Sequence, residues 1–231
     1  MSKTNHTITD VFFDLDHTLW DFERNSALTF KKIFAENNIA VDVEAFLSYY
    51  VPVNMKYWAL YREDKIDQHT LRYKRLKEVF DLIPFEVSDS NIHLISEEYI
   101  KYLPTFNHLF EGAIEVLEYL KPKYNLHIIT NGFQEVQNGK LKNANIEHYF
   151  DTVTNSEMAG VKKPNPKIFE YALQLAKAEK ATSLMVGDSL EADMEGAKNI
   201  GLDALFFNEA RSEQTHDFPQ IYHLSEIKNM L

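Results

Sequence analysis

Two carboxylates, Asp14 and Asp16, lie two residues apart at the end of an apolar run that begins at Val11. Side chains two residues apart point to the same side of a strand, so these two would be crowded together if the strand continued. Crowded carboxylates repel each other unless a cation or a shared proton relieves them. The pattern indicates a metal or acid–base site, although an isolated Asp-x-Asp also caps turns and Thr18 suits a turn equally well.

A second acidic cluster follows another apolar run, residues 183–186. Asp188 comes directly after this predicted strand, and Asp193 falls in the helical turn that follows. Carboxylate oxygens with no His or Cys beside them favour magnesium over zinc. An Asp-Ser pair at a strand-to-helix junction is also an ordinary helix N-cap, and that alternative weakens when two such junctions carry the same chemistry.

A third strand end carries Thr130, Asn131 and Gly132, which offer a hydroxyl, an amide and backbone N–H groups. Such groups can cradle phosphate oxygens. Lys162 and Lys163 then supply cations just before a predicted helix. Each segment alone leaves the question open, because Thr-Asn-Gly is also a common turn and paired lysines are usually solvated surface.

The elements that must position these residues alternate between strand and helix. Hydrophobic periodicity predicts strands at 11–13, 126–129, 150–154, 183–186 and 204–207, helices at 114–120, 134–143, 166–176 and 192–199, and a last short element at 221–224. This order predicts an α/β fold with a doubly wound, parallel, Rossmann-like sheet. Ligands bind such sheets at the carboxyl ends of the strands, where all three clusters fall.

The segment from about residue 21 to residue 103 has helical periodicity and no convincing strand. We therefore expect a catalytic core made of residues 1–19 and 106–231, interrupted by a helical cap domain over residues 20–105. A helical unit inserted directly after the first carboxylate motif is a candidate lid that excludes water and contacts the substrate.

The composition limits the classes of function. The 231 residues include no Cys, which excludes disulfides and a cysteine nucleophile, and 24 Lys+Arg against 35 Asp+Glu give a net charge of -11. Such a charge disfavours polymeric nucleic acid and anionic membranes. No apolar run is long enough to span a bilayer, and the first ten residues lack a signal-peptide core, so we expect a cytoplasmic protein.

The combination of motifs resembles a known family. Asp14-x-Asp16-x-Thr18, Thr130, Lys163-Pro164 and Gly187-Asp188 with Asp193 are similar to the four ordered motifs of the haloacid dehalogenase superfamily, in the form with a helical cap between motifs one and two. Trp20-Asp21-Phe22 and Thr130-Asn131-Gly132-Phe133 are most similar to its house-cleaning pyrimidine 5'-nucleotidase branch.

The resemblance implies a mechanism and a cofactor. Asp14 would attack phosphorus to form an aspartyl-phosphate, and Asp16 would act as the general acid and then the general base. Mg²⁺ would be held by the Asp14 carboxylate, the Asp16 backbone carbonyl and the Asp188 carboxylate. The resemblance also implies phosphate-binding residues, Thr130, Lys163 and Asn131, and supporting residues around them, Thr18 and Asp193. Asp16 argues for phosphotransfer and against carbon–halogen cleavage, which needs no acid for an alkoxide leaving group.

The substrate must be selected by residues outside these motifs. Trp20 and Phe22 after the first motif, and Trp58, Tyr61 and Arg62 at helical spacing, are candidates for a flat stacking surface for a base, although such rings commonly form a cap's own core. We expect a small phosphomonoester, with pyrimidine nucleoside 5'-monophosphates foremost. Alternatives are a phosphoglycolate or sugar-phosphate phosphatase, a phosphosugar mutase, and a noncatalytic binding protein of the same fold.

Overall fold

The computed structural model describes residues 7–231 and divides the chain into two compact units. The first unit ends at Phe22 and resumes with Asn107–Leu231, and the second is Glu23–Phe106. These boundaries lie one to three residues from those predicted. Residues 1–6, which are most of the N-terminal segment in which the sequence shows no signal-peptide core, lie outside the described residues. None of the helices in residues 7–231 is both long and apolar enough to cross a membrane.

The first unit is built on a parallel sheet of six strands in the order β3-β2-β1-β4-β5-β6. The strands are β1 (Asp10–Phe13), β2 (Asn125–Thr130), β3 (Thr152–Asn155), β4 (Ser183–Gly187), β5 (Asp203–Phe207) and β6 (Gln220–Ile221). The central strand β1 pairs with β2 on one side and β4 on the other. This arrangement confirms the predicted doubly wound α/β sheet and makes the three motif-bearing strands immediate neighbours.

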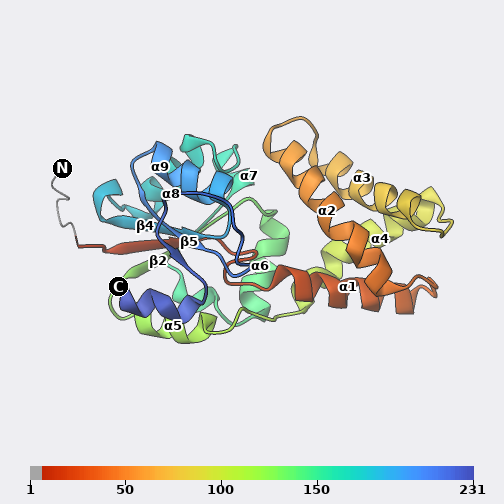
Figure 1. Ribbon diagram of the computed structural model, residues 1–231, viewed down its shortest axis with the longest axis horizontal. Coiled ribbons are helices and arrows are strands. Elements are labelled where there is room, and N and C mark those ends of the chain that lie inside the picture. Colours follow the sequence, from red (N-terminus) through yellow and green to blue (C-terminus); the bar gives the residue numbers. More distant parts are fainter. Residues whose placement is uncertain (1–6) are drawn as a thin grey trace. The chain divides into compact units, whose positions relative to one another are not determined.

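Helices cover both sides of the sheet (Figure 1), with α8 and α9 on one side and α5 on the other. The α-helices of this unit are α5 (Ala113–Leu120), α6 (Gln134–Asn143), α7 (Ser156–Ala159), α8 (Pro166–Ala176) and α9 (Gly196–Asn199). The helix predicted at 192–199 is different in kind: residues Leu190–Glu195 form a π-helix, and a short α9 follows it. The chain ends in a 3₁₀ helix, Leu224–Asn229.

The sheet is fixed by an apolar core beneath α8 and α9. Phe12, Ile129, Met185 and Phe206, one from each of the four inner strands β1, β2, β4 and β5, pack in one buried cluster with Phe169 of α8. Burying each such side chain contributes about 1.5–3 kcal/mol. Because this packing and the pairing of the strands hold the sheet rigid, the polar residues at the carboxyl ends of the strands lie in fixed positions.

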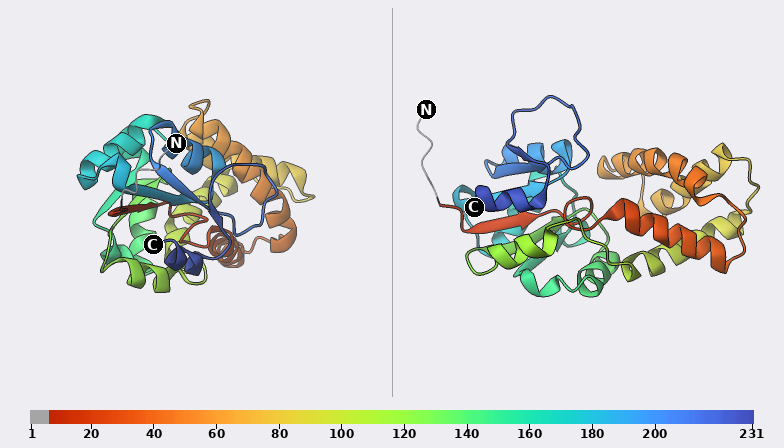
Figure 2. Two further views of the ribbon diagram at one scale, coloured as in Figure 1. Left: turned by 60° about the vertical axis from the view of Figure 1, so that its left-hand side comes forward. Right: turned by 60° about the horizontal axis from the view of Figure 1, so that its bottom comes forward.

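The second unit consists of helices, α1 (Phe22–Glu36), α2 (Val43–Arg62), α3 (Gln68–Leu82) and α4 (Asp89–Tyr102), coloured from red-orange to yellow-green in Figure 2. Asp42, Asp67 and Ser88 cap the N-termini of α2, α3 and α4 by accepting a backbone N–H. Its core is aromatic: the ring of Phe30 lies within 6 Å of the rings of Phe34, Phe46, Tyr50 and Tyr99. The predicted helical insertion is therefore a packed unit of its own.

Candidate active site

The site lies at the carboxyl edge of the sheet, where Asp14 follows β1, Thr130 ends β2 and Asp188 follows β4. The backbone N–H of Asp14 still donates to the Val186 carbonyl at 2.9 Å, so β1 and β4 stay in register up to the first motif. The chain then turns through His17, whose φ of 63° is left-handed. Strand pairing alone therefore brings together side chains that are up to 174 residues apart in the sequence.

Lys163 is the centre of the site. Its Nζ lies 2.7 Å from Asp14 Oδ1 and 2.6 Å from Asp193 Oδ1, and it donates to the Ile129 carbonyl at 2.7 Å. The side chain is only 2% exposed. Burial works to lower the pKa of Lys163, but the charges of Asp14 and Asp193 outweigh it and raise the pKa above its ordinary value. The ammonium is thus a permanent cation buried beside the first motif.

Asn131 holds the backbone of Lys163 rather than its side chain. The amide Nδ2 of Asn131 donates to the Lys163 carbonyl at 3.0 Å, and its Oδ1 accepts from the Lys163 N–H at 2.7 Å. The sequence suggested Asn131 as a phosphate-binding residue, and in the structure its side-chain amide makes this pair of bonds to Lys163. Asn131 therefore fixes where the lysine emerges from its loop.

Three carboxylates, those of Asp14, Asp188 and Asp193, offer oxygen atoms that all lie within 4.8 Å of one another. Burial raises the pKa of Asp14 well above its ordinary value, against the lowering effect of Lys163. Burial also raises the pKa of Asp188 to about 7, with the charge of Asp193 adding to it. Thr18 donates to Asp188 Oδ1 at 3.2 Å, as its place among the supporting residues suggested. An all-oxygen set with too little positive charge nearby fits a hard divalent cation such as Mg²⁺.

The π-helix after β4 places Asp193. Asp193 Oδ2 accepts the Ser189 N–H at 3.0 Å, while the Ser189 hydroxyl caps the helix at the Ala192 N–H. A Cβ on Gly187 would lie 2.3 Å from Asp193 Oδ2, so only glycine leaves room for this carboxylate. Asp193 therefore binds Ser189 through one oxygen and Lys163 through the other, and holds the lysine side chain in place. Short π-helical turns like this one often occur at functional sites.

Asp16 is held by two side chains of α6 that the sequence did not point to. Lys140 Nζ lies 2.5 Å from Asp16 Oδ1, and Gln137 Nε2 donates to Asp16 Oδ2 at 2.9 Å. Both partners are buried, at 2% and 1% exposure, whereas the Asp16 side chain keeps 21% of its surface exposed. Gln137 Nε2 also donates to Thr130 Oγ1 at 2.7 Å. The first and second motifs are thus joined through α6.

The residues suggested for substrate stacking fall into two groups, one in each unit. Trp20 is fully buried and Phe22 is 7% exposed, both beside the Lys140 ammonium of the first unit. In the helical unit the rings of Trp58 and Tyr61 meet edge to face at 83°, and Arg62 ends the same helix. The two rings therefore do not form the flat surface that their spacing suggested.

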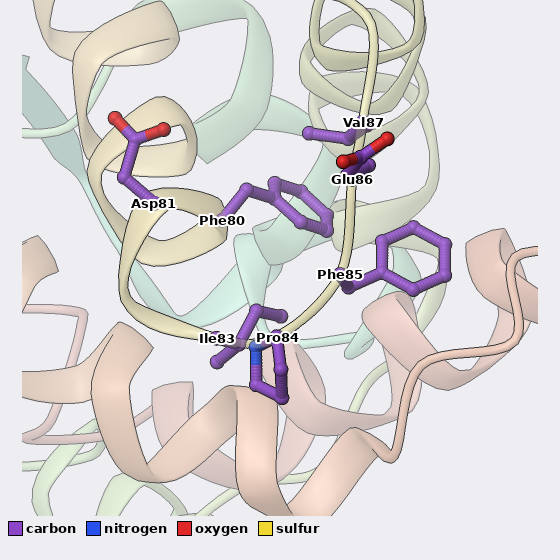
Figure 3. Close-up of a pocket in the computed structure, with 7 residues that line it drawn as sticks. All are labelled: Phe80, Asp81, Ile83, Pro84, Phe85, Glu86 and Val87. Atoms are coloured by element: carbon purple, nitrogen blue, oxygen red, sulfur yellow. The ribbon is translucent and has the colours of Figure 1, made fainter.

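A pocket of about 630 Å³ lies in the helical unit, at the connection between α3 and α4 (Figure 3). It is lined by Phe80, Asp81, Ile83, Pro84, Phe85, Glu86 and Val87. Two of these residues are acidic and none is basic, so the lining has no cationic side chain to hold a phosphate.

Known proteins match both the sequence and the fold. Pyrimidine 5'-nucleotidase PynA of Streptococcus pneumoniae is 30% identical over 96% of this chain and 92% of its own length. Pyrimidine 5'-nucleotidase YjjG of Escherichia coli is 30% identical over 95% of each chain. The magnesium-bound structure of the putative HAD-hydrolase YfnB from Bacillus subtilis has a TM-score of 0.87 at 24% identity, covering 97% of this chain and 98% of that one. The family model of haloacid dehalogenase-like hydrolases matches residues 10–201, and the chain belongs to that family.

Proposed function

We propose that the chain is a magnesium-dependent phosphomonoester hydrolase that works through a phosphorylated Asp14. The observation that carries the proposal is the buried Lys163 ammonium, fixed between Asp14 and Asp193, with Asp16 two residues beyond the nucleophile. A carboxylate beside a fixed cation and a separate acid–base group are the parts that phosphoryl transfer needs. A noncatalytic binding protein would have no use for charges that are costly to bury.

In the first step, a carboxylate oxygen of Asp14 attacks the phosphorus of the ester and the bond to the ester oxygen breaks. Asp16, which carries a proton at the start of this step, gives that proton to the ester oxygen, which leaves as an alcohol, and Asp16 becomes a carboxylate. The Thr130 hydroxyl donates to a phosphoryl oxygen, and the positive charge of Lys163, whose three N–H donors are bonded to Asp14, Asp193 and the Ile129 carbonyl, stabilises the charge that spreads over these oxygens. The pKa of Asp14 is raised by burial and lowered by Lys163, so the lysine favours the ionised carboxylate that attack requires.

In the second step, Asp16 takes a proton from a water molecule as that water attacks the phosphorus of the aspartyl-phosphate. The bond from phosphorus to the Asp14 oxygen breaks, inorganic phosphate leaves and Asp14 is again a carboxylate. Asp16 thereby recovers the proton that it lost in the first step, so the cycle closes without a further reagent.

The Asp14 and Asp188 carboxylates and the Asp16 backbone carbonyl are the groups that we assign to Mg²⁺. Asp193 belongs to the same acidic group, but its oxygens are bonded to Lys163 and Ser189, so we assign it to the lysine. When bound, the metal supplies a positive charge that draws the phosphate towards Asp14 and stabilises its transferring oxygens.

We infer that the substrates are nucleoside 5'-monophosphates of the pyrimidine type. The support is the pair of pyrimidine 5'-nucleotidases that match this chain almost from end to end. The catalytic residues select only the phosphate, because Asp14, Asp16, Lys163 and Asp188 would serve any small phosphate ester. Discrimination among esters must therefore come from residues outside this set.

The test is phosphate release from a panel of pyrimidine and purine 5'-monophosphates, phosphoglycolate and sugar phosphates, with Mg²⁺ and with excess EDTA. We expect release by the wild type that requires Mg²⁺ and is highest for the pyrimidine nucleotides. Asp14→Asn, which keeps the size of the side chain and removes the nucleophile, should abolish it.

Equal release by the wild type and Asp14→Asn would refute the nucleophile. A wild type that instead interconverts two sugar phosphates and releases little phosphate would be a mutase. A flat profile across the panel would leave the phosphatase standing and refute the nucleotide specificity.

A further inference from the structure

The carboxylate of Asp16 is gripped from α6 by two residues that none of the four motifs contains. Gln137 and Lys140 are three residues apart, so they lie on the same face of α6. Lys140 takes one carboxylate oxygen and Gln137 takes the other, at 2.5 Å and 2.9 Å. With both oxygens engaged, the carboxylate plane cannot rotate about its last bond, and part of its surface still faces solvent.

We propose that Gln137 and Lys140 form an α6 clamp, a pair of positioning residues that orients Asp16 for proton transfer to the leaving group. The proposal rests on the proposed function, because it assigns the clamp to the general acid of that reaction. Neither clamp residue touches the substrate or the reacting atoms; both act through Asp16.

The surroundings of Lys140 show that its position is enforced. The ammonium is 2% exposed and lies 4.3 Å from the centre of the Trp20 ring and 5.4 Å from that of Phe22. Ring faces attract a cation, and a desolvated ammonium needs a negative partner close by. The carboxylate of Asp16, which is the form that proton donation leaves, is such a partner at 2.5 Å. Trp20 and Phe22 therefore pack against the Lys140 ammonium and help to hold it in place, which is a structural role for the two large rings directly after the first motif.

The orientation of the Gln137 amide is also enforced. Its Nε2 carries both useful contacts, to Asp16 and to Thr130, while its buried Oε1 has no hydrogen-bond partner among residues 7–231. Turning the amide over would place Oε1 against the Asp16 carboxylate, acceptor against acceptor. The charge on Asp16 thus selects the orientation even though Oε1 stays unbonded.

The same amide directs the second motif. Thr130 Oγ1 accepts from Gln137 at 2.7 Å and from the Gly132 N–H at 3.1 Å. A hydroxyl oxygen has two lone pairs and one proton, so two donors leave the Thr130 hydroxyl free only to donate. A hydroxyl fixed as a donor suits a phosphoryl oxygen, which only accepts. One glutamine therefore orients the general acid and a phosphate-binding group together.

The leaving group provides a test that general damage to the fold would not imitate. A nucleoside 5'-monophosphate expels an alkoxide and needs the acid, whereas p-nitrophenyl phosphate expels a stable phenolate and hardly needs it. General acid catalysis supplies roughly 100- to 10,000-fold. We expect Lys140→Met to lower kcat/KM about 10- to 100-fold for a pyrimidine nucleotide and less than about threefold for the aryl ester.

Companion variants keep the test decisive if Lys140→Met folds poorly. Gln137→Leu keeps the size of the side chain, removes both donors and should shift the ratio of the two kcat/KM values in the same direction. Lys140→Arg should restore the ratio because it restores the cation. Lys142→Met removes an exposed charge from the same helix and should leave the ratio unchanged. In an Asp16→Asn background, Lys140→Met should change the ratio no further.

An equal loss on both esters in Lys140→Met and in Gln137→Leu overturns the clamp and leaves the phosphatase intact, as does no loss on either ester. A further drop in the ratio in the Asp16→Asn background also overturns it, because Lys140 would then act by another route. A wild type that hydrolyses neither ester overturns the proposed function and the clamp together.

Discussion

Removing the Lys163 ammonium should destabilise the first unit strongly. Lys163→Met keeps the length of the side chain but leaves Asp14 and Asp193 facing each other with their shared cation gone. Breaking a buried ion pair in this way costs about 3–5 kcal/mol. At roughly 2–4 °C per kcal/mol for a domain of this size, the melting temperature should fall by about 6–20 °C.

The assay should follow the first unit alone. The chain has two Trp residues, and Trp20 lies in the sheet unit while Trp58 lies in the helical unit. In a Trp58→Phe background, thermal unfolding followed by Trp fluorescence in EDTA therefore reports the environment of Trp20. Lys167→Met, at an exposed position near the start of α8, is the control for loss of a lysine charge.

A second substitution separates the charge effect from simple loss of packing. Lys163→Met combined with Asp193→Asn removes one of the two opposed carboxylates and should recover part of the lost stability. A fall of less than about 2 °C in Lys163→Met, or a double variant less stable than the single one, would refute the reasoning that the lysine compensates these charges.

Three further predictions concern the metal, the clamp and the opposite end of the sheet. Mg²⁺ at about 100 times its Kd should add about 2.7 kcal/mol to the free energy of unfolding of the wild type and of Asp193→Asn, but not to that of Asp188→Asn. If both variants lose this stabilisation by Mg²⁺ equally, Asp193 is a metal ligand as well. Gly132→Ala places a Cβ 2.3 Å from Gln137 Nε2 and should act like Gln137→Leu on the two esters with little change in melting temperature; unchanged kinetics would contradict it. Burial lowers the pKa of His127 from 6.5, so as the pH falls the unfolded chain binds this proton before the folded chain does, and the free energy of unfolding should fall below about pH 6.5. In denaturant titrations at several pH values, His127→Gln should flatten this slope of stability against pH. An identical slope in wild type and variant would exclude His127 as its source.

The strands that carry the motifs were predictable because each is a short apolar run that ends in polar residues. Asp14, Thr130 and Asp188 could be placed at one sheet edge from that pattern alone, since parallel strands bring their carboxyl ends together. The π-helix at Leu190–Glu195 could not, because a wider turn leaves no distinct period in a segment of six residues. The role of Asp193 depends on that turn.

The α6 clamp escaped sequence reasoning for a physical reason. The buried face of α6 carries Gln137 and Lys140 beside Val136 and Leu141, so hydrophobic periodicity is weak where burial is high. Burial of a lysine can be predicted only when its ion-pair partner is known, and the partner of Lys140, Asp16, lies 124 residues away in the chain. The sequence could not separate two roles for Trp20, because a large ring next to a motif can stack on a substrate or pack against a buried ammonium. In the structure Trp20 is buried beside Lys140.

The charges at the strand ends support the proposed divalent cation. The site holds four carboxylates against two ammonium groups, a formal charge of -2, from Asp14, Asp16, Asp188, Asp193, Lys140 and Lys163. A phosphate dianion would be repelled by that site, and burial already resists full ionisation of Asp14 and Asp188. One divalent cation brings the formal charge to zero, and it does so beside the nucleophile, whereas Lys140 and Lys163 are already bonded to carboxylates. Under the proposed function, the acidic chain would therefore accept a small phosphate ester only beside the bound cation, and its net charge would still disfavour long polyanions.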